Sequence, residues 1–241
     1  MPEISSSRQP RNLFRTSGSI IFFITLYTCA LFAQPAYDKL SKFTGSDNLG
    51  QTAAIDGEVA IVGAPVLAAP GCYIYHFNGS FWEEKQILTG PANSGFAAAL
   101  DINGNYAIIG DRLDDASCPG DAGCNSGAAY LYKFDGVQWN LLKMLYAGDA
   151  ASQNFFGLKV AINGDIAVVT AQYDSNDPLN GNNYQFQGSV YIFQRDAGGA
   201  DNWGQVAKFK SADVAVDRQD GFGRSLDVSG NYVLVGSNNT D

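Results

Sequence analysis

The chain has 241 residues, of which 46% are hydrophobic and 16% charged, a composition that suits a globular protein with a sizeable core. Its formal net charge is −9. An acidic surface argues against nucleic acids and anionic membranes as partners, because both attract basic patches. No segment carries a convincing helical period of apolar residues, so we expect an all-β fold.

The N-terminal segment 1–33 has the features of a secretory signal peptide. Three arginines precede an apolar run at 20–32, and Ala33 is a small residue just before Gln34. The run is shorter than the roughly 20 apolar residues of a spanning helix, which makes a membrane anchor the weaker alternative. We expect residues 1–33 to be removed, which takes away three arginines and one glutamate and lowers the net charge from −9 to −11. The mature chain then has no transmembrane span and is secreted or at the cell surface.

Two apolar runs joined by a short glycine-containing pair occur four times, at 49–63, 96–110, 156–170 and 222–236. The joining pairs are Asp56-Gly57, Asn103-Gly104, Asn163-Gly164 and Ser229-Gly230. Such a pair predicts a β-hairpin with a type I′ turn, because glycine accepts the positive φ that this turn requires. Four copies in phase predict a repeat architecture.

Each hairpin is followed by an aromatic, alternating segment and then by a segment that begins at Trp82, Trp139 or Trp203. Each unit therefore has four strands, A to D, which predicts a β-propeller of four-stranded antiparallel blades. The blades span about 49–90, 96–146 and 156–210, with a partial fourth at 222–241. Residues 37–43 resemble a D strand, which suggests ring closure by the N-terminus. We expect the propeller domain, 34–241, to be a fragment of a seven-bladed ring.

The connections between strands B and C differ most between the repeats. They run over 65–70, 111–126 and 172–187, so the second and third carry inserts. Loops inserted on a rigid scaffold are where binding usually occurs, and B–C loops share one face of a blade, opposite the short A–B turns. The predicted ligand contacts are Asp111, Arg112, Asp114, Asp115, Tyr173, Asp174, Asp177 and Tyr184. The alternative is that these are merely solvated acidic loops, and Ca²⁺ bridging at their carboxylates is left open.

The cysteines are compatible with an oxidising compartment. Cys118 and Cys124 lie in one loop and form the natural disulfide pair, while Cys72 aligns with small core residues and is expected to be a buried free thiol.

The pairs Phe156-Gly157 and Phe222-Gly223, together with Val62-Gly63-Ala64-Pro65, resemble the FG-GAP repeat of integrin α-subunit-type propellers. The resemblance covers nearly all of 37–241. It implies an extracellular propeller, usually of seven blades, that mostly binds proteins or glycans. Many members hold Ca²⁺ in an Asp-rich A–B turn. Here the A–B turns are two-residue hairpins, too short to wrap an ion that takes six to eight oxygens, so we expect no metal there.

No catalytic constellation can be assembled. His76 is the only histidine and aligns with Lys133 and Gln194, which favours a surface position over a general base. The recurring tryptophans are read as blade packing rather than as a sugar-stacking stripe. The sequence therefore predicts an exported, non-enzymatic propeller that binds a protein or glycan through its B–C loops. Two alternatives remain open: a propeller lyase or hydrolase whose site lies in further blades, and a purely structural surface domain.

Overall fold

A computed structural model describes residues 48–118, 123–174, 187–210 and 221–237, together with the backbone of two short strands. These two strands, β1 (Phe23–Ile24) and β2 (Leu40–Ser41), pair with each other in antiparallel fashion. β1 falls within the predicted signal peptide and β2 within the segment 37–43. The remainder of both segments lies outside the described residues, and their processing and ring-closing roles stay predictions.

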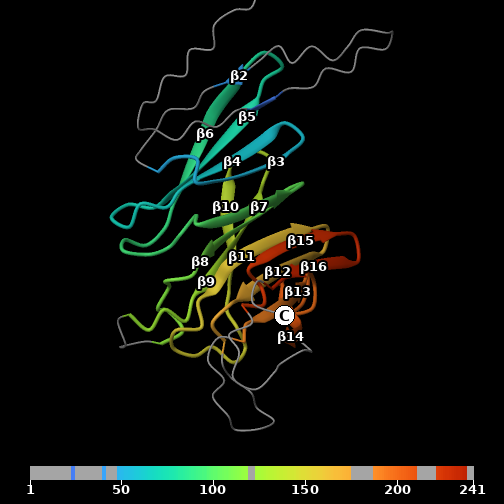
Figure 1. Ribbon diagram of the computed structural model, residues 1–241. Helices are drawn as coiled ribbons and strands as arrows, with labels where there is room; N and C mark the ends of the chain where they lie inside the picture. Colours follow the sequence, from blue (N-terminus) through green and yellow to red (C-terminus); the bar gives the residue numbers. More distant parts are fainter. Residues whose placement is uncertain are drawn as a thin grey trace, which may run out of the picture.

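The described chain forms three four-stranded antiparallel sheets and a hairpin (Figure 1). The first sheet contains β3 (Thr52–Asp56), β4 (Val59–Ala64), β5 (Gly71–Phe77) and β6 (Trp82–Thr89). The second contains β7 (Ala99–Asn103), β8 (Tyr106–Asp111), β9 (Ala128–Phe134) and β10 (Trp139–Leu145). The third contains β11 (Phe156–Asn163), β12 (Ile166–Ala171), β13 (Ser189–Gln194) and β14 (Gly204–Lys210). The hairpin joins β15 (Ser225–Ser229) to β16 (Tyr232–Gly236). Each sheet is a meander in sequence order, which confirms the predicted propeller blades with strands A to D.

The A–B hairpins have a different turn from the one predicted. In the first, Asp56 pairs with Val59, so Gly57 and Glu58 form the two-residue loop. Gly57 has a φ of +55°, and Glu58 is not among the residues with positive φ. A positive φ at the first central position alone is the signature of a type II′ turn, whereas type I′ needs it at both. The prediction of type I′ is therefore wrong, and the other three hairpins follow the same pattern.

The residue before each turn glycine links one blade to the next. Asp56 Oδ2 accepts a hydrogen bond from the Gly104 amide at 2.6 Å, and Asn103 Oδ1 accepts one from the Gly164 amide at 2.8 Å. Asn163 accepts one from Gly230 at 3.1 Å. The turn side chains therefore form a ladder that runs from blade to blade.

The A strands lie next to one another along the inner edge of the assembly, where β3, β7, β11 and β15 are neighbours (Figure 1). An inner strand has one edge without a strand partner, and its amides need other acceptors. Asp101 on β7 supplies one, because its Oδ2 accepts a hydrogen bond from the Ile162 amide on β11 at 2.8 Å. Side chains thus replace sheet pairing between blades.

Apolar residues of strands B and C fill the spaces between blades. One core cluster joins Leu131 and Leu145 of the second blade to Tyr191 and Trp203 of the third. Another joins Ile74 of the first blade to residues of the second. Strands C are buried on both faces, as the sequence predicts for a blade between neighbours. Trp139 and Trp203 are almost fully buried, which confirms the packing interpretation for these two tryptophans, whereas Trp82 is partly buried.

A backbone contact sets how closely the second and third blades approach. A Cβ added to Gly110, at the end of β8, would lie 2.1 Å from the carbonyl oxygen of Gly157 on β11. At the preceding joint, a Cβ on Gly63 would lie 2.4 Å from the carbonyl oxygen of Ala97. The glycine just before the last residue of strand B and the residue after the aromatic of the next repeat, Phe96 or Phe156, therefore form one joint between two blades.

We expect Gly110→Ala to destabilise the fold by about 2–3 kcal/mol, because backbone of the adjacent blade must move to admit the methyl group. Gly104→Ala is the matched control. Gly104 has positive φ but open space around its Cα, so only the conformational cost of about 1 kcal/mol applies. Urea unfolding of both variants measures the difference. Equal losses would show that the close approach does not limit blade spacing.

Candidate functional site

The B–C and D–A connections share one rim of the blades, and most of the predicted ligand-contact residues of the described chain belong to it. Three of the predicted residues, Asp111, Asp114 and Asp174, are buried there. Their carboxylates are committed to partners within the protein. Burial removes them from the residues that a macromolecular ligand can touch, and it corrects the picture of solvated acidic loops for these positions.

Asp111 ends β8 and faces the connection that enters the second blade. Its Oδ1 accepts hydrogen bonds from the Gly95 amide at 2.7 Å and from the Leu113 amide at 3.2 Å. Its Oδ2 is buried and has no hydrogen-bond partner among the described residues. Burial raises the pKa of this carboxyl above its ordinary value of 3.8, against the amide hydrogen bond from Gly95, which lowers it. Asp111 thus carries a buried charge that is only half satisfied.

Asp114 organises the second B–C connection. Its Oδ2 accepts a hydrogen bond from the Tyr130 hydroxyl at 2.7 Å, and its Oδ1 accepts one from the Ala116 amide at 2.8 Å. Its backbone carbonyl accepts from Gly127, the residue before β9. Burial, followed by the hydrogen bond to Asp114, raises the pKa of Tyr130. Asp114 therefore fixes where the insert leaves and rejoins the sheet.

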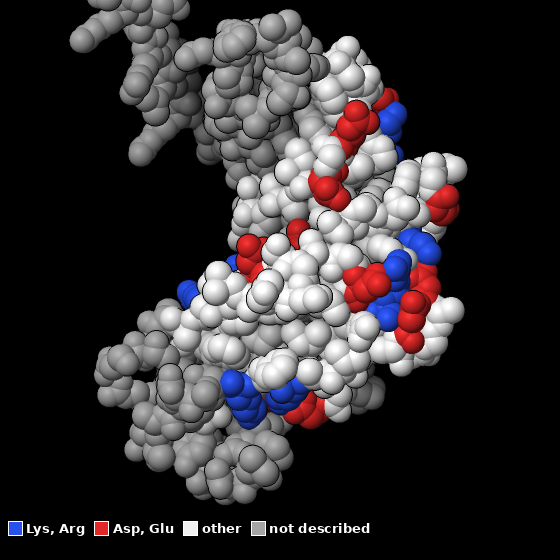
Figure 2. Space-filling view, turned by 90° about the vertical axis from the view of Figure 1, so that its right-hand side faces the viewer, with Lys and Arg blue, Asp and Glu red and all other residues white. Residues whose placement is uncertain are grey.

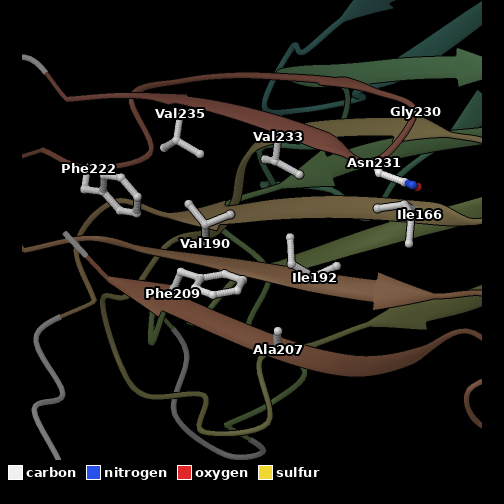
Figure 3. A pocket seen from close by; sticks show the side chains of 10 residues that line it. All are labelled: Ile166, Val190, Ile192, Ala207, Phe209, Phe222, Gly230, Asn231, Val233 and Val235. Atoms are coloured by element: carbon white, nitrogen blue, oxygen red, sulfur yellow. The ribbon is translucent and has the colours of Figure 1, made fainter. Parts of the chain in front are cut away.

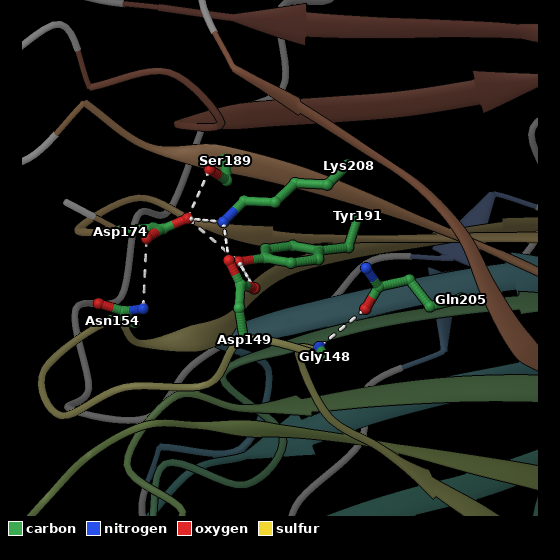
Figure 4. Close-up of polar contacts among 8 residues, drawn as sticks. All are labelled: Gly148, Asp149, Asn154, Asp174, Ser189, Tyr191, Gln205 and Lys208. Carbon is green, nitrogen blue, oxygen red and sulfur yellow. Dashed lines mark hydrogen bonds and ion pairs between the residues drawn. The ribbon is translucent and has the colours of Figure 1, made fainter. Parts of the chain in front are cut away.

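Asp174 occupies the equivalent position in the third blade, within a larger polar cluster (Figure 4). Its Oδ2 accepts hydrogen bonds from the hydroxyls of Ser189 at 2.6 Å and Tyr191 at 3.1 Å. The Lys208 ammonium lies 2.5 Å from the same oxygen and also pairs with Asp149. Asp149 belongs to the D–A connection before the blade, so Lys208 ties the two connections together.

The predicted disulfide is present. Cys118 and Cys124 are bonded, with their Cα atoms 6.3 Å apart, and Cys72 is a buried free thiol as expected. Asp115 closes the same loop, because its two oxygens accept hydrogen bonds from the Gly123 and Asn125 amides at 2.7 and 2.6 Å. The insert is therefore stapled covalently and by a carboxylate.

The stapled loop continues along the D–A connection that leads into the third blade. The Cys124 carbonyl accepts a hydrogen bond from the Gln153 amide at 2.6 Å, and the Asn125 carbonyl accepts one from the Phe155 amide at 3.1 Å. These bonds place the Phe155 side chain beside both inserts.

Phe155 joins predicted residues of the two inserts. The Arg112 guanidinium carbon lies 5.8 Å from the centroid of the Phe155 ring. The Tyr173 ring meets the Phe155 ring edge-on, with centroids 5.1 Å apart. All three side chains are partly exposed. The candidate site is this trio, which we call the rim cluster.

The structure thus brings Arg112 and Tyr173 together, places Asp115 in the neighbouring staple, and buries Asp111, Asp114 and Asp174. Asp177 and Tyr184 lie outside the described residues. Phe155 was missed by the sequence reasoning. A signal existed, because the residue before the repeat aromatic is Gly95 in the second blade and Gly221 in the fourth but phenylalanine in the third.

Cys72 and His76, the thiol and the imidazole of the described chain that catalysis could use, both lie on β5. His76 packs edge-on against Phe134, with ring centroids 5.6 Å apart, and its pKa is lowered mainly by burial. The expected surface position is thus only partly correct. Burial raises the pKa of Cys72 to about 12, so its thiol is not activated as a nucleophile. Among the described residues, no group of three or more His, Cys, Asp or Glu side chains is arranged to hold a metal.

An apolar groove of about 510 Å³ lies between the third blade and the β15–β16 hairpin (Figure 3). Phe209 on β14 lines it and is 57% exposed. Its repeat equivalents Leu88 and Leu145 are 5% and 1% exposed, because strands of the following blade cover them. The groove therefore has the character of a blade-packing surface, and its lining lacks the convergent polar groups of a ligand pocket.

Charges on the surface are mixed. Figure 2 shows acidic and basic side chains next to one another in small groups on a largely uncharged face. Ion pairs such as Lys133–Asp201 and Arg195–Asp165 fit this picture. The described part of that face has no broad basic patch for nucleic acid. Within the described residues, no helix is long and apolar enough to cross a membrane.

Comparison with known proteins agrees with the geometry. The blades, their meander order and their inner strands define the class, a protein built of β-propeller blades. More particularly, the family model described as FG-GAP repeat matches residues 139–193, so the chain carries an FG-GAP repeat. The match runs from strand D of the second blade to strand C of the third, and it includes Phe155. No curated protein matches the chain.

Asp111→Asn is expected to be at least as stable as the parent protein at neutral pH, because it removes a buried charge and keeps an Oδ1 acceptor for Gly95 and Leu113. The raised pKa means that the folded state binds the Asp111 proton more tightly than the unfolded state. At pH values between the ordinary pKa of 3.8 and the raised pKa, Asp111 is therefore protonated mainly in the folded state. The contribution of Asp111 to the stability of the parent protein should grow as pH falls through this window and shrink as pH rises. Urea unfolding at neutral and mildly acidic pH measures both effects, and a variant that keeps the parent's pH dependence would contradict the assignment.

Lys208→Met is expected to cost about 3 kcal/mol, because it leaves the buried Asp174 carboxylate without its cation. Methionine is the natural residue at the equivalent position, Met144. Lys85→Met removes an exposed partner of Glu83 and should cost at most about 0.5 kcal/mol. Adding Asp174→Asn to Lys208→Met should recover much of the loss, and additive losses in that double-mutant cycle would show that the two residues are not coupled.

Proposed function

We propose that the protein is an exported, non-enzymatic recognition module that binds a protein or glycan through the rim formed by its B–C and D–A connections. The observation that carries the proposal is the rim cluster. Arg112 and Tyr173 come from separate inserts and meet on Phe155, which belongs to neither. Inserts that served only as linkers would not need to converge on one aromatic ring.

The rim is also organised in advance. The disulfide, the Asp115 bonds to Gly123 and Asn125, and the Asp174–Lys208 pair all restrain the loops that carry the cluster. Loops ordered before binding lose less conformational entropy when a ligand arrives. Tyrosine and arginine are also the side chains that dominate many binding surfaces.

The opposite rim has less to offer a ligand. Its A–B turns are two residues long, and Asp56, Asn103 and Asn163 use their side chains to bond the next blade. Export is supported by the basic, apolar and small-residue order of 1–33 and by the disulfide, which persists in oxidising compartments. A non-enzymatic role is supported by the burial of Cys72, whose raised pKa leaves the thiol unactivated, and by the packing of His76 against Phe134.

The test is a binding screen of the secreted protein on protein and glycan arrays. Shortening 111–126 and 172–187 to the length of 65–70 should remove at least nine-tenths of the binding signal. The control variant, Glu58→Ala with Asn105→Ala, changes exposed residues of the opposite rim without breaking the blade-to-blade bonds. Binding that survives the shortened loops and is lost in the control would place the site on the wrong rim. Repeating the screen with a chelator tests whether Ca²⁺ contributes.

A further inference from the structure

Phe155 has a backbone conformation that large side chains rarely adopt. Its φ is +54°, in the left-handed region. The equivalent residues at the entries to the first and fourth blades are Asn48, with φ +64°, and Gly221, with φ +61°. Asparagine and glycine tolerate this region, whereas an aromatic residue pays a conformational cost there. A strained residue that persists in a surface loop calls for a functional explanation.

Core packing does not supply that explanation. The Phe155 ring belongs to none of the hydrophobic core clusters of the described chain, although its neighbour Phe156 is fully buried in one of them. The ring is partly exposed and contacts Arg112 and Tyr173. The strained backbone therefore serves to present an aromatic surface at the rim.

The backbone around Phe155 is held in place from both sides. The Phe155 amide bonds the Asn125 carbonyl at 3.1 Å and the Phe156 amide bonds the Ser126 carbonyl at 2.9 Å. Gln153 adds two side-chain hydrogen bonds to Gly123 and Cys124 at 2.7 and 3.2 Å. Because these amides are used, this part of the rim offers no open strand edge to an extended peptide of the kind that binds by adding a strand.

Arg112 is the charged member of the rim cluster. Among the described residues it forms no ion pair, although Arg195, Lys133 and Lys208 all pair with carboxylates. A guanidinium that lies over an aromatic ring keeps its N–H fork free for a planar, bidentate acceptor, and a carboxylate fits that fork best. In a chain of net charge −9, this side chain is positioned to meet an anion from outside.

We propose that the rim cluster is a subsite for a carboxylate-bearing sugar, such as a uronic acid residue of an acidic glycan. The inference rests on the proposed function and narrows its ligand class. The rings of Phe155 and Tyr173 contact the apolar C–H face of the sugar, and the Arg112 guanidinium takes the carboxylate in a bidentate pair. The absence of an open strand edge here favours a glycan over an acidic peptide.

The experiment measures calorimetric binding of an oligogalacturonate of defined length to the full chain, with a neutral malto-oligosaccharide of equal length as the comparison. We expect the acidic sugar to bind at least tenfold more tightly. Arg112→Gln should weaken binding at least tenfold, and Arg112→Lys should weaken it by a smaller factor because lysine keeps the charge but loses the fork.

Phe155→Gly gives the sharpest test, because it removes the ring and relieves the strain together. We expect binding to be lost while the melting temperature stays equal or rises. Asn48→Gly is the matched control, since it relaxes the same repeat position in the first blade and should leave binding unchanged.

Each other outcome overturns the inference. Equal affinity for the acidic and the neutral sugar would show that Arg112 does not recognise a carboxylate. Tighter binding of an aspartate-rich peptide than of either sugar would show that the rim binds proteins instead of glycans. Acidic-sugar binding that is unaffected by Phe155→Gly and Arg112→Gln places the subsite elsewhere. An array ligand whose binding requires the inserts but not Arg112 or Phe155 would support the proposed function and contradict the acidic-sugar subsite.

Discussion

The blade joints depend on one steric constraint, the approach of a carbonyl group to an α-carbon that has no side chain. Gly110 meets the carbonyl of Gly157 at one joint, and Gly63 meets the carbonyl of Ala97 at the preceding one. At the third joint, strand B carries Thr170 in place of glycine. The glycine there is Gly223 of the following hairpin, which packs against the Thr170 side chain. This close spacing allows the turn side chains to reach the next turn and the loops of neighbouring blades to touch. The contact between Phe155 and Arg112 exists because the blades on either side of that joint are so close.

The fold was predictable because its signals are local. Alternating apolar residues, the glycine of each A–B turn and the tryptophan that opens strand D all lie within a few residues of the element they define. The turn type was not, since the position of glycine relative to the last paired residues depends on strand register, and only the structure shows Asp56 opposite Val59. The candidate site was predicted in part. Arg112 and Tyr173 were found from the inserted loops, whereas Phe155 sits in a connection of ordinary length that drew no attention.

Three aspartates show why burial in loops is hard to read from sequence. A carboxylate in or beside a polar loop suggests exposure to solvent, yet Asp111, Asp114 and Asp174 are buried. Asp114 relies on the Tyr130 hydroxyl and Asp174 on Lys208, and neither partner adjoins it in sequence. Asp111 receives only amide hydrogen bonds at one of its two oxygens. Each insert is therefore anchored by a buried aspartate, and a different set of hydrogen bonds or ion pairs offsets the free energy of burying each carboxylate.

The side chains of the two rims make different kinds of contact. On the A–B rim, three side chains are bound to the next blade, so a change of length or sequence there would weaken the assembly itself. On the B–C rim, buried aspartates anchor the points where each insert leaves its sheet, and the connections beyond these anchors differ in length between the repeats. Arg112 and Tyr173 belong to two of these connections and meet at Phe155 of the D–A connection. The three side chains converge although Phe155 has a strained backbone there, and core packing does not account for that strain, which is why the proposed ligand site is placed on this rim.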